Sequence, residues 1–104
     1  MLDERPARRV TYDAARNVTT LELGGAPGPF QEERATLLLD PGGLLVGVDL
    51  RDGRDQGIVV MLGAHEEVAE TRGDRVRVAR DAAGAPAAIE IRATRARGAE
   101  MGIF

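Results

Sequence analysis

Apolar and polar residues alternate along much of the chain. Val76 and Val78 lie two positions apart in a mostly charged stretch, residues 74–80, and Ile89 and Ile91 are spaced in the same way. A period of two puts apolar side chains on one face of a strand and polar side chains on the other, as in half-buried antiparallel sheets. No window has the apolar stripe of a helix. The pattern predicts strands near 8–13, 18–23, 34–40, 44–51, 57–62, 66–71, 74–80 and 86–93.

Aspartates stand where several of these predicted strands end. Asp13, Asp40 and Asp81 each open a short turn segment. An aspartate in this position accepts hydrogen bonds from the backbone amides of its own turn, so we assign these carboxylates a structural role. A further turn is predicted at residues 72–74, and a flexible linker at residues 24–34.

The alternation also fixes how the strands of three hairpins are aligned. The predicted apolar pairs are Val10 with Leu21, Leu37 with Val48, and Val78 with Ile89. The matching pairs on the polar face are Arg9 with Glu22, Thr36 with Asp49, and Arg77 with Glu90. Val76 and Ile91 must then share the buried face. The predicted core is aliphatic and comprises Val10, Tyr12, Leu21, Leu23, Leu37, Leu39, Val46, Val48, Leu50, Val60, Leu62, Val76, Val78, Ile89 and Ile91.

A larger pattern occurs twice, over residues 19–50 and 58–91. Leu23 corresponds to Leu62 and Asp40 to Asp81, with a short insertion in the second copy. A chain of 104 residues is long enough for one domain and too short for two ordinary ones. We therefore predict a single all-β domain over residues 1–104, a small antiparallel sandwich or partly closed barrel built from an internal duplication. The repeat units cover about residues 10–51 and 57–93, and the C-terminal tail covers residues 94–104.

Two stretches of the chain resemble a family of short bacterial all-β domains of unknown function. They are Val10-Thr11-Tyr12-Asp13 and the segment DPGGLLVGVDL at residues 40–50. The chain departs from the family pattern at Asn17, where the family has an aspartate, and at the polar residues Thr19 and Thr20. The resemblance implies a small β fold in a bacterial protein. It brings no established activity, cofactor or site residue.

Composition excludes several kinds of chemistry. The chain has no cysteine, lysine or serine, and all 14 basic residues are arginine. Disulfides, thiolate metal sites, lysine Schiff bases and serine nucleophiles are therefore absent. The formal net charge of −3 disfavours nucleic acid as a partner. The mixed charges of the first ten residues and the lack of a long apolar stretch predict a cytoplasmic protein without membrane association.

Individual candidate sites give weak signals. His65 is the only histidine and has two glutamates beside it but no nucleophile to activate, which favours an exposed loop. Residues 49–55 resemble a calcium loop, but their acids recur at every third position instead of alternate ones, so we interpret them as a charged hairpin loop. The glycines of residues 24–29 precede no predicted helix and have no lysine. Glu32 and Glu33 are adjacent, so a strand directs them to opposite faces. We predict no catalytic residue, cofactor site or metal site.

Two features point to a binding surface. Arg75, Arg77 and Arg92 fall on one face of the predicted sheet, where they would receive an acidic partner or phosphates; the alternative is a solvated sheet face. The tail ends in Ile103 and Phe104, which we expect to dock on the same domain or on a second copy. These five residues are the predicted partner-binding residues.

The sequence therefore favours a non-catalytic protein-binding or assembly module. We expect it to self-associate, as a homodimer, through its sheet edges or its C-terminal tail, because open sheet edges are commonly covered in this way. The alternative is a small-ligand binder or an enzyme with a pocket between the two repeat units.

Overall fold

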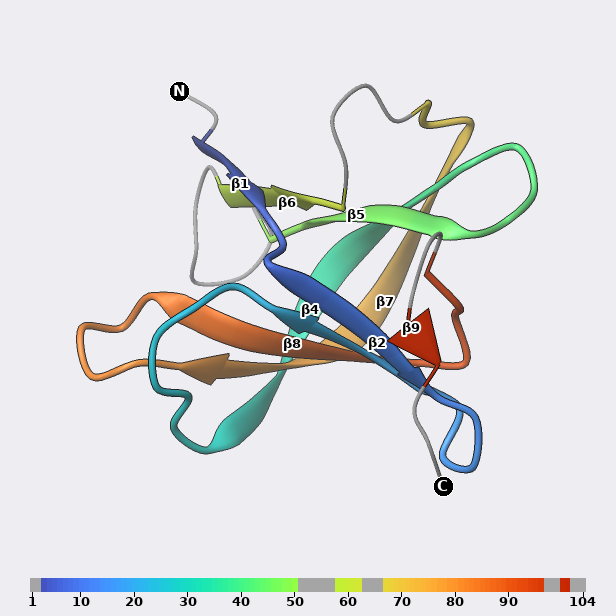
Figure 1. Ribbon diagram of the computed structural model, residues 1–104. Helices are drawn as coiled ribbons and strands as arrows, with labels where there is room; N and C mark the ends of the chain where they lie inside the picture. The colour runs from blue at the N-terminus through green and yellow to red at the C-terminus, as the bar shows by residue number, and fades with distance from the viewer. Residues whose placement is uncertain (1–2, 51–57, 63–66, 97–99, 102–104) are drawn as a thin grey trace.

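The computed structural model describes residues 3–50, 58–62, 67–96 and 100–101, and none of these residues is helical. The strands are β1 (Asp3–Pro6), β2 (Arg9–Asp13), β3 (Val18–Glu22), β4 (Phe30–Leu39), β5 (Leu45–Asp49), β6 (Ile58–Met61), β7 (Glu70–Arg80), β8 (Pro86–Arg92) and β9 (Glu100–Met101). They form one sheet in the order β1-β6-β5-β4-β7-β8-β3-β2-β9, which curls round on itself (Figure 1). The predicted all-β class, as a partly closed and mainly antiparallel barrel, is confirmed.

The segment from β1 to β2 brings two distant strands of the sheet together. β1 pairs in parallel with β6, and β2 pairs antiparallel with β3. Between them, the N–H of Ala7 donates to the carbonyl oxygen of Met61 at 3.1 Å, and the N–H of Arg8 donates to that of Glu22 at 2.7 Å. Because β6 and β3 lie on opposite sides of the strand order, this segment closes part of the barrel.

The three predicted hairpins have the predicted registers. The observed pairs include Val10 with Leu21, Leu37 with Val48, Val78 with Ile89, Arg9 with Glu22, Thr36 with Asp49, and Arg77 with Glu90. Val76 and Ile91 are both buried in the same core cluster, as the alternation requires. Alternation and turn position were therefore sufficient to align these strands.

The turns after β4 and β7 have the same hydrogen bonds. Through Oδ1, at 2.8 to 3.0 Å, Asp40 accepts from the N–H groups of Gly42 and Leu44, and Asp81 accepts from those of Ala83 and Ala85. Gly43 and Gly84 have positive φ angles of 82° and 87°, a conformation that favours glycine. Asp13 accepts from the amides of its own turn in a similar way. The structural role predicted for the three aspartates is confirmed.

Outward from the boundary between β4 and β7, two further strands pair antiparallel on each side: β5 and β6 in one direction, β8 and β3 in the other. We call β4, β5 and β6 the first half of the sheet, and β7, β8 and β3 the second half. Arg34 and Arg75 face each other at the boundary. The register shifts once in each hairpin, next to Leu39 and next to Arg80, immediately before the turn aspartate. The two halves therefore lie about a local pseudo-twofold axis. The predicted duplication agrees with this arrangement and stays a prediction.

The core is aliphatic and differs in some members from the predicted one. Its buried cluster comprises Leu21, Ala35, Leu37, Leu39, Leu45, Val48, Leu50, Val60, Val76, Val78, Ile89, Ile91 and Ala96. Val46 is fully buried, as predicted, but it lies outside this cluster, because the register shift between Leu38 and Leu39 puts Leu45, which was not predicted, among the core residues. Tyr12 lies outside the cluster, half-buried, and its hydroxyl donates to Asn17 Oδ1 at 2.6 Å.

Several predicted boundaries are wrong. The predicted turn at residues 72–74 lies inside β7, because β7 pairs along its length with β4. The predicted linker at residues 24–34 ends earlier, since β4 begins at Phe30. β1 and β9 were not predicted.

The C-terminal tail pairs with its own chain. Glu100 and Met101 form β9 beside Thr11 and Tyr12 of β2. Ile103 and Phe104 lie outside the residues that the structure describes. Within the described ranges, no helix is long and apolar enough to cross a membrane.

Candidate functional site

Two rows of side chains cross the outer face of β4, β7 and β8. In the first, Glu32 lies opposite Arg77, which lies opposite Glu90. We call these three residues the balanced row. In the second, Arg34 lies opposite Arg75, and Arg92, two residues beyond Glu90 on β8, lines the same hollow as Arg75. We call Arg34, Arg75 and Arg92 the arginine row. The two rows are neighbours on one surface and differ in their pattern of charge.

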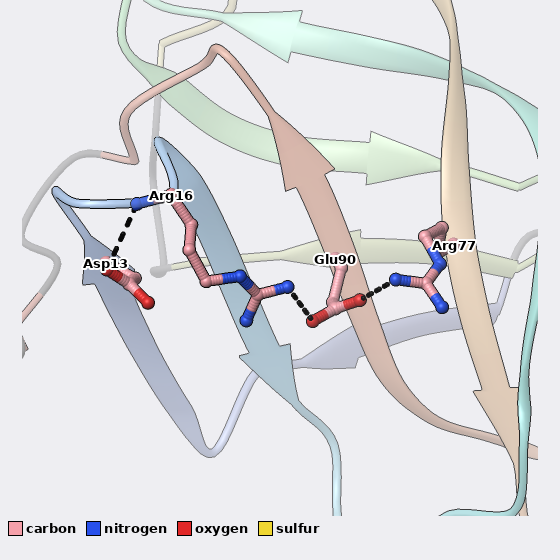
Figure 2. A network of polar contacts seen from close by, with 4 residues as sticks. All are labelled: Asp13, Arg16, Arg77 and Glu90. Carbon is pink, nitrogen blue, oxygen red and sulfur yellow. Dashed lines mark hydrogen bonds and ion pairs between the residues drawn. The ribbon is translucent and has the colours of Figure 1, made fainter.

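Glu90 of the balanced row is neutralised by two arginines. Arg77 Nη1 donates to Glu90 Oε1 at 3.0 Å, and Arg16 Nη2 lies 3.7 Å from Glu90 Oε2 (Figure 2). Only 12 % of the Glu90 side chain is exposed, so its carboxylate is well shielded from water. The Arg77 guanidinium also lies 5.3 Å from the centroid of the Phe30 ring. The fold itself therefore accounts for this row.

The arginine row has three like charges and little compensation. Arg75 Nη1 pairs with Glu32 Oε1 at 3.0 Å, but 67 % of the Arg75 side chain is exposed. Arg34 and Arg92 are exposed, and neither forms a hydrogen bond or ion pair with the described part of the chain. Like charges directly opposite each other destabilise a sheet. The arginine row therefore does not owe its presence to a stabilising effect on the fold.

The surface around the arginine row is hollowed. A hollow of about 540 Å³ is lined by Arg34, Ala35, Gly73, Asp74 and Arg75, at the boundary between the two halves. Gly73 leaves space here, because an added Cβ would meet no atom within 4 Å. A second hollow of about 240 Å³ is lined by Glu32, Asp74, Arg75, Arg77, Glu90 and Arg92. Guanidinium groups around such hollows suit carboxylates, which they bind through paired N–H donors.

The structure brings three of the five predicted partner-binding residues together. Arg75, Arg77 and Arg92 line the same hollow. Arg34 was not among the predicted binding residues, because residue 34 was expected to end the linker. The alternation of Glu32, Arg34 and Thr36 was the available signal, since it extends the strand backward from residue 36.

The described residues give no support to the other candidate catalytic and metal sites. His65 lies outside them, as do residues 51–57 of the calcium-like loop, and Asp49 of that loop is buried in β5. Glu32 and Glu33 point to opposite faces, as predicted: Glu32 pairs with Arg75, and Glu33 forms a bidentate ion pair with Arg80. Within the described ranges, no group of three or more histidines or acids is placed to hold a metal ion.

Comparison with protein-family models, curated proteins and solved structures found no match to this chain. The resemblance to a family of short bacterial domains therefore stays a prediction. The function has to be inferred from the geometry of the surface and from its charges.

Proposed function

We propose that this protein is a non-catalytic protein-binding module that receives an acidic segment of a partner protein on its arginine row. The supporting observation is the contrast between two neighbouring rows of one sheet face. The balanced row is neutralised within the chain, whereas Arg34 and Arg92 form no ion pair or hydrogen bond with the described residues. Carboxylates of a partner would supply the missing negative charge.

Energetics support a partner that brings several carboxylates together. An exposed ion pair contributes only about 0.2–1 kcal/mol, so one glutamate on one of these arginines would bind weakly. A segment with several acids engages the three guanidiniums together, and the positive surface also increases its rate of association. Binding of this kind weakens as salt is added, because exposed charges are screened.

The sheet edges support a different partner more than a second copy of the chain. β1 has the sequence Asp-Glu-Arg-Pro, and β9 has two residues. Charges, proline and short length all discourage an edge from pairing with another chain. β9 also pairs within its own chain, with β2. The self-association predicted from the sequence therefore has less support than an acidic protein partner.

A small-ligand binder is the second candidate. The hollow of about 540 Å³ lies at the boundary between the two halves and has the size of a small-molecule site. Its lining is largely charged, however, and the apolar surface that small-molecule sites provide is limited to Ala35 and Gly73. This lining favours an extended acidic segment over a small molecule.

The test measures binding of a fluorescent peptide of alternating glutamate and glycine by anisotropy, at low and high salt. We expect the triple variant Arg34→Gln, Arg75→Gln, Arg92→Gln to weaken binding by about a hundredfold, since each charged contact contributes up to about tenfold. The matched control replaces Arg8, Arg9 and Arg95, which are exposed arginines outside the row, with glutamine. The proposal fails if both triple variants lose the same affinity, or if single-stranded DNA binds more tightly than the peptide.

A further inference from the structure

A difference between the two halves exposes a further hollow on the sheet. In the first half, Gly47 of β5 lies between Leu38 on β4 and Met61 on β6. These side chains cover Gly47: a Cβ added there would lie 2.8 Å from Met61 Sδ and 3.0 Å from Leu38 Cδ1. The equivalent place in the second half has the same backbone pairing around it.

The equivalent place in the second half is open. Ala88 of β8 lies between Ala79 on β7 and Glu22 on β3. A short side chain thus replaces Leu38, and a charged one replaces Met61. A hollow of about 320 Å³ lies here, with Ala87 and Ala88 among its lining residues. Both alanines are buried members of β8, so they provide a rigid apolar floor.

An arginine stands at the rim of this hollow. Arg8, Gly24 and Gly25 line it together with the alanines. The Arg8 guanidinium packs over Gly24, where an added Cβ would lie 3.2 Å from both Arg8 Cζ and Nε. Gly24 also has a φ of 106°, so only glycine fits both the backbone and the guanidinium. The backbone N–H of Arg8 is bonded to Glu22, which fixes the start of this side chain.

The polar groups at the rim are available to a ligand. The Arg8 guanidinium forms no ion pair or hydrogen bond with the described part of the chain. The backbone N–H groups of Gly24 and Gly25 likewise donate no hydrogen bond to any described residue. Glu22 also lines the hollow, and its carboxylate lies 3.9 Å from Arg9. Asp81 Oδ2 is also close, 3.3 Å from where a Cβ on Gly25 would lie, so these nearby carboxylates favour a singly charged anion over a phosphate dianion.

We propose that this hollow binds a small carboxylic acid with a short apolar chain. Arg8 holds the carboxylate, and the amides of Gly24 and Gly25 are further donors at the same rim. The short apolar chain lies over Ala87 and Ala88, whose side chains are already largely covered, so most of the affinity comes from the carboxylate. This site is separate from the arginine row, so it neither requires nor excludes the protein partner proposed above.

The test is a titration of the whole chain, labelled with nitrogen-15, with butyrate as the probe. We expect amide shifts at Gly24, Gly25, Ala87 and Ala88, with a dissociation constant of about a millimolar, as is usual for so small a ligand. Butyramide, which has the same shape without the charge, and inorganic phosphate are expected to bind at least about tenfold more weakly.

Two variants test the site from different sides. Arg8→Gln should weaken butyrate binding by about tenfold, whereas Arg16→Gln, at an exposed arginine in the turn between β2 and β3, should leave it unchanged. Glu22→Met introduces the side chain that covers Gly47 in the first half, and it should block the hollow. The amide spectrum shows directly whether each variant is folded. Equal binding of butyrate and butyramide, tighter binding of phosphate, or an unchanged affinity in Arg8→Gln would overturn the proposal.

Discussion

Gly47 on β5 and Ala88 on β8 occupy the same place in the two halves of the sheet, yet their surroundings differ. Leu38 and Met61 cover the first, and a hollow beside Arg8 adjoins the second. The turns, register shifts and pairing around both places are nevertheless the same. The features that the halves share are those that a backbone needs to fold, and the features that differ are on the surface. Binding surfaces should therefore be sought where the halves differ.

The boundary between the halves supports the same conclusion. Arg34 and Arg75 are equivalent and face each other across the pseudo-twofold axis. Beyond them the side chains differ, because Thr36 of the first half corresponds to Arg77 of the second. Only the second half therefore contributes an arginine to the balanced row with Glu32 and Glu90. The charged face belongs mainly to the second half.

The comparison is tested most strongly in the core, where both halves should contribute alike. Leu37 of the first half and Ile89 of the second are both fully buried. We expect Leu37→Ala and Ile89→Ala each to lower the free energy of unfolding by about 2–5 kcal/mol, because each leaves a cavity. Urea denaturation measures both values. A loss below about 1 kcal/mol in one half alone would show that the halves are packed unequally.

The covered position in the first half should not tolerate the side chain found in the second. A Cβ at Gly47 would lie 2.8 Å from Met61 Sδ and 2.9 Å from the carbonyl oxygen of Val60, which is backbone and cannot move aside easily. Gly47→Ala should therefore lower the free energy of unfolding by about 1–3 kcal/mol. The control is Gly73→Ala, because Gly73 has open space around it. Thermal unfolding distinguishes the two variants, and equal melting temperatures would contradict the expectation.

The two aspartate turns should be equally important. Asp40 and Asp81 each accept two backbone hydrogen bonds of nearly equal length. Asp40→Ala and Asp81→Ala should each lower the free energy of unfolding by about 1 kcal/mol, measured in urea. Asp13→Ala should lower it less, because one of its two bonds is longer, at 3.3 Å. A clear difference between Asp40→Ala and Asp81→Ala would mean that the turns are alike in geometry but not in stability.

The smallest expected effect compares the two rows of charge. Arg34→Gln removes a like charge opposite Arg75 and should raise the free energy of unfolding by about 0.2–0.5 kcal/mol. Arg77→Gln removes the partner of Glu90 and should lower it by at least as much. Urea denaturation at low salt resolves the two signs, and high salt should diminish the effect at Arg34. A loss of stability in Arg34→Gln would indicate that the arginine row is part of the scaffold.

The fold was predictable where local alternation and turns determine it. The registers of three hairpins followed from residues such as Val78 and Ile89, and the turn aspartates were recognised from sequence. β1 and β9 could not be recognised, because both depend on parallel pairing with distant strands. The place of Leu45 in the core was missed for a different reason: a register shift interrupts the period of two, and its position depends on the facing strand.

The candidate site was only partly predictable. Arg75, Arg77 and Arg92 follow from alternation within two strands, whereas Arg34 joins them through pairing between strands distant in sequence. The hollow beside Arg8 was not predictable at all. It depends on which side chains flank Ala88, and these come from β7 and β3, whose positions on either side of β8 the sequence does not state.

Ala7 and Arg8 donate their backbone hydrogen bonds to two different strands, and this arrangement affects how the protein resists aggregation. These consecutive residues bind β6 and β3, so both strands lose their outer neighbour if the segment from β1 to β2 detaches. The exposed edges would then run beside Val60 and Leu21, which are fully buried in the folded protein. Open apolar edges readily recruit strands from other molecules. The segment from β1 to β2 therefore covers two edges at once, and amide hydrogen exchange at Ala7 and Arg8 reports how often it detaches.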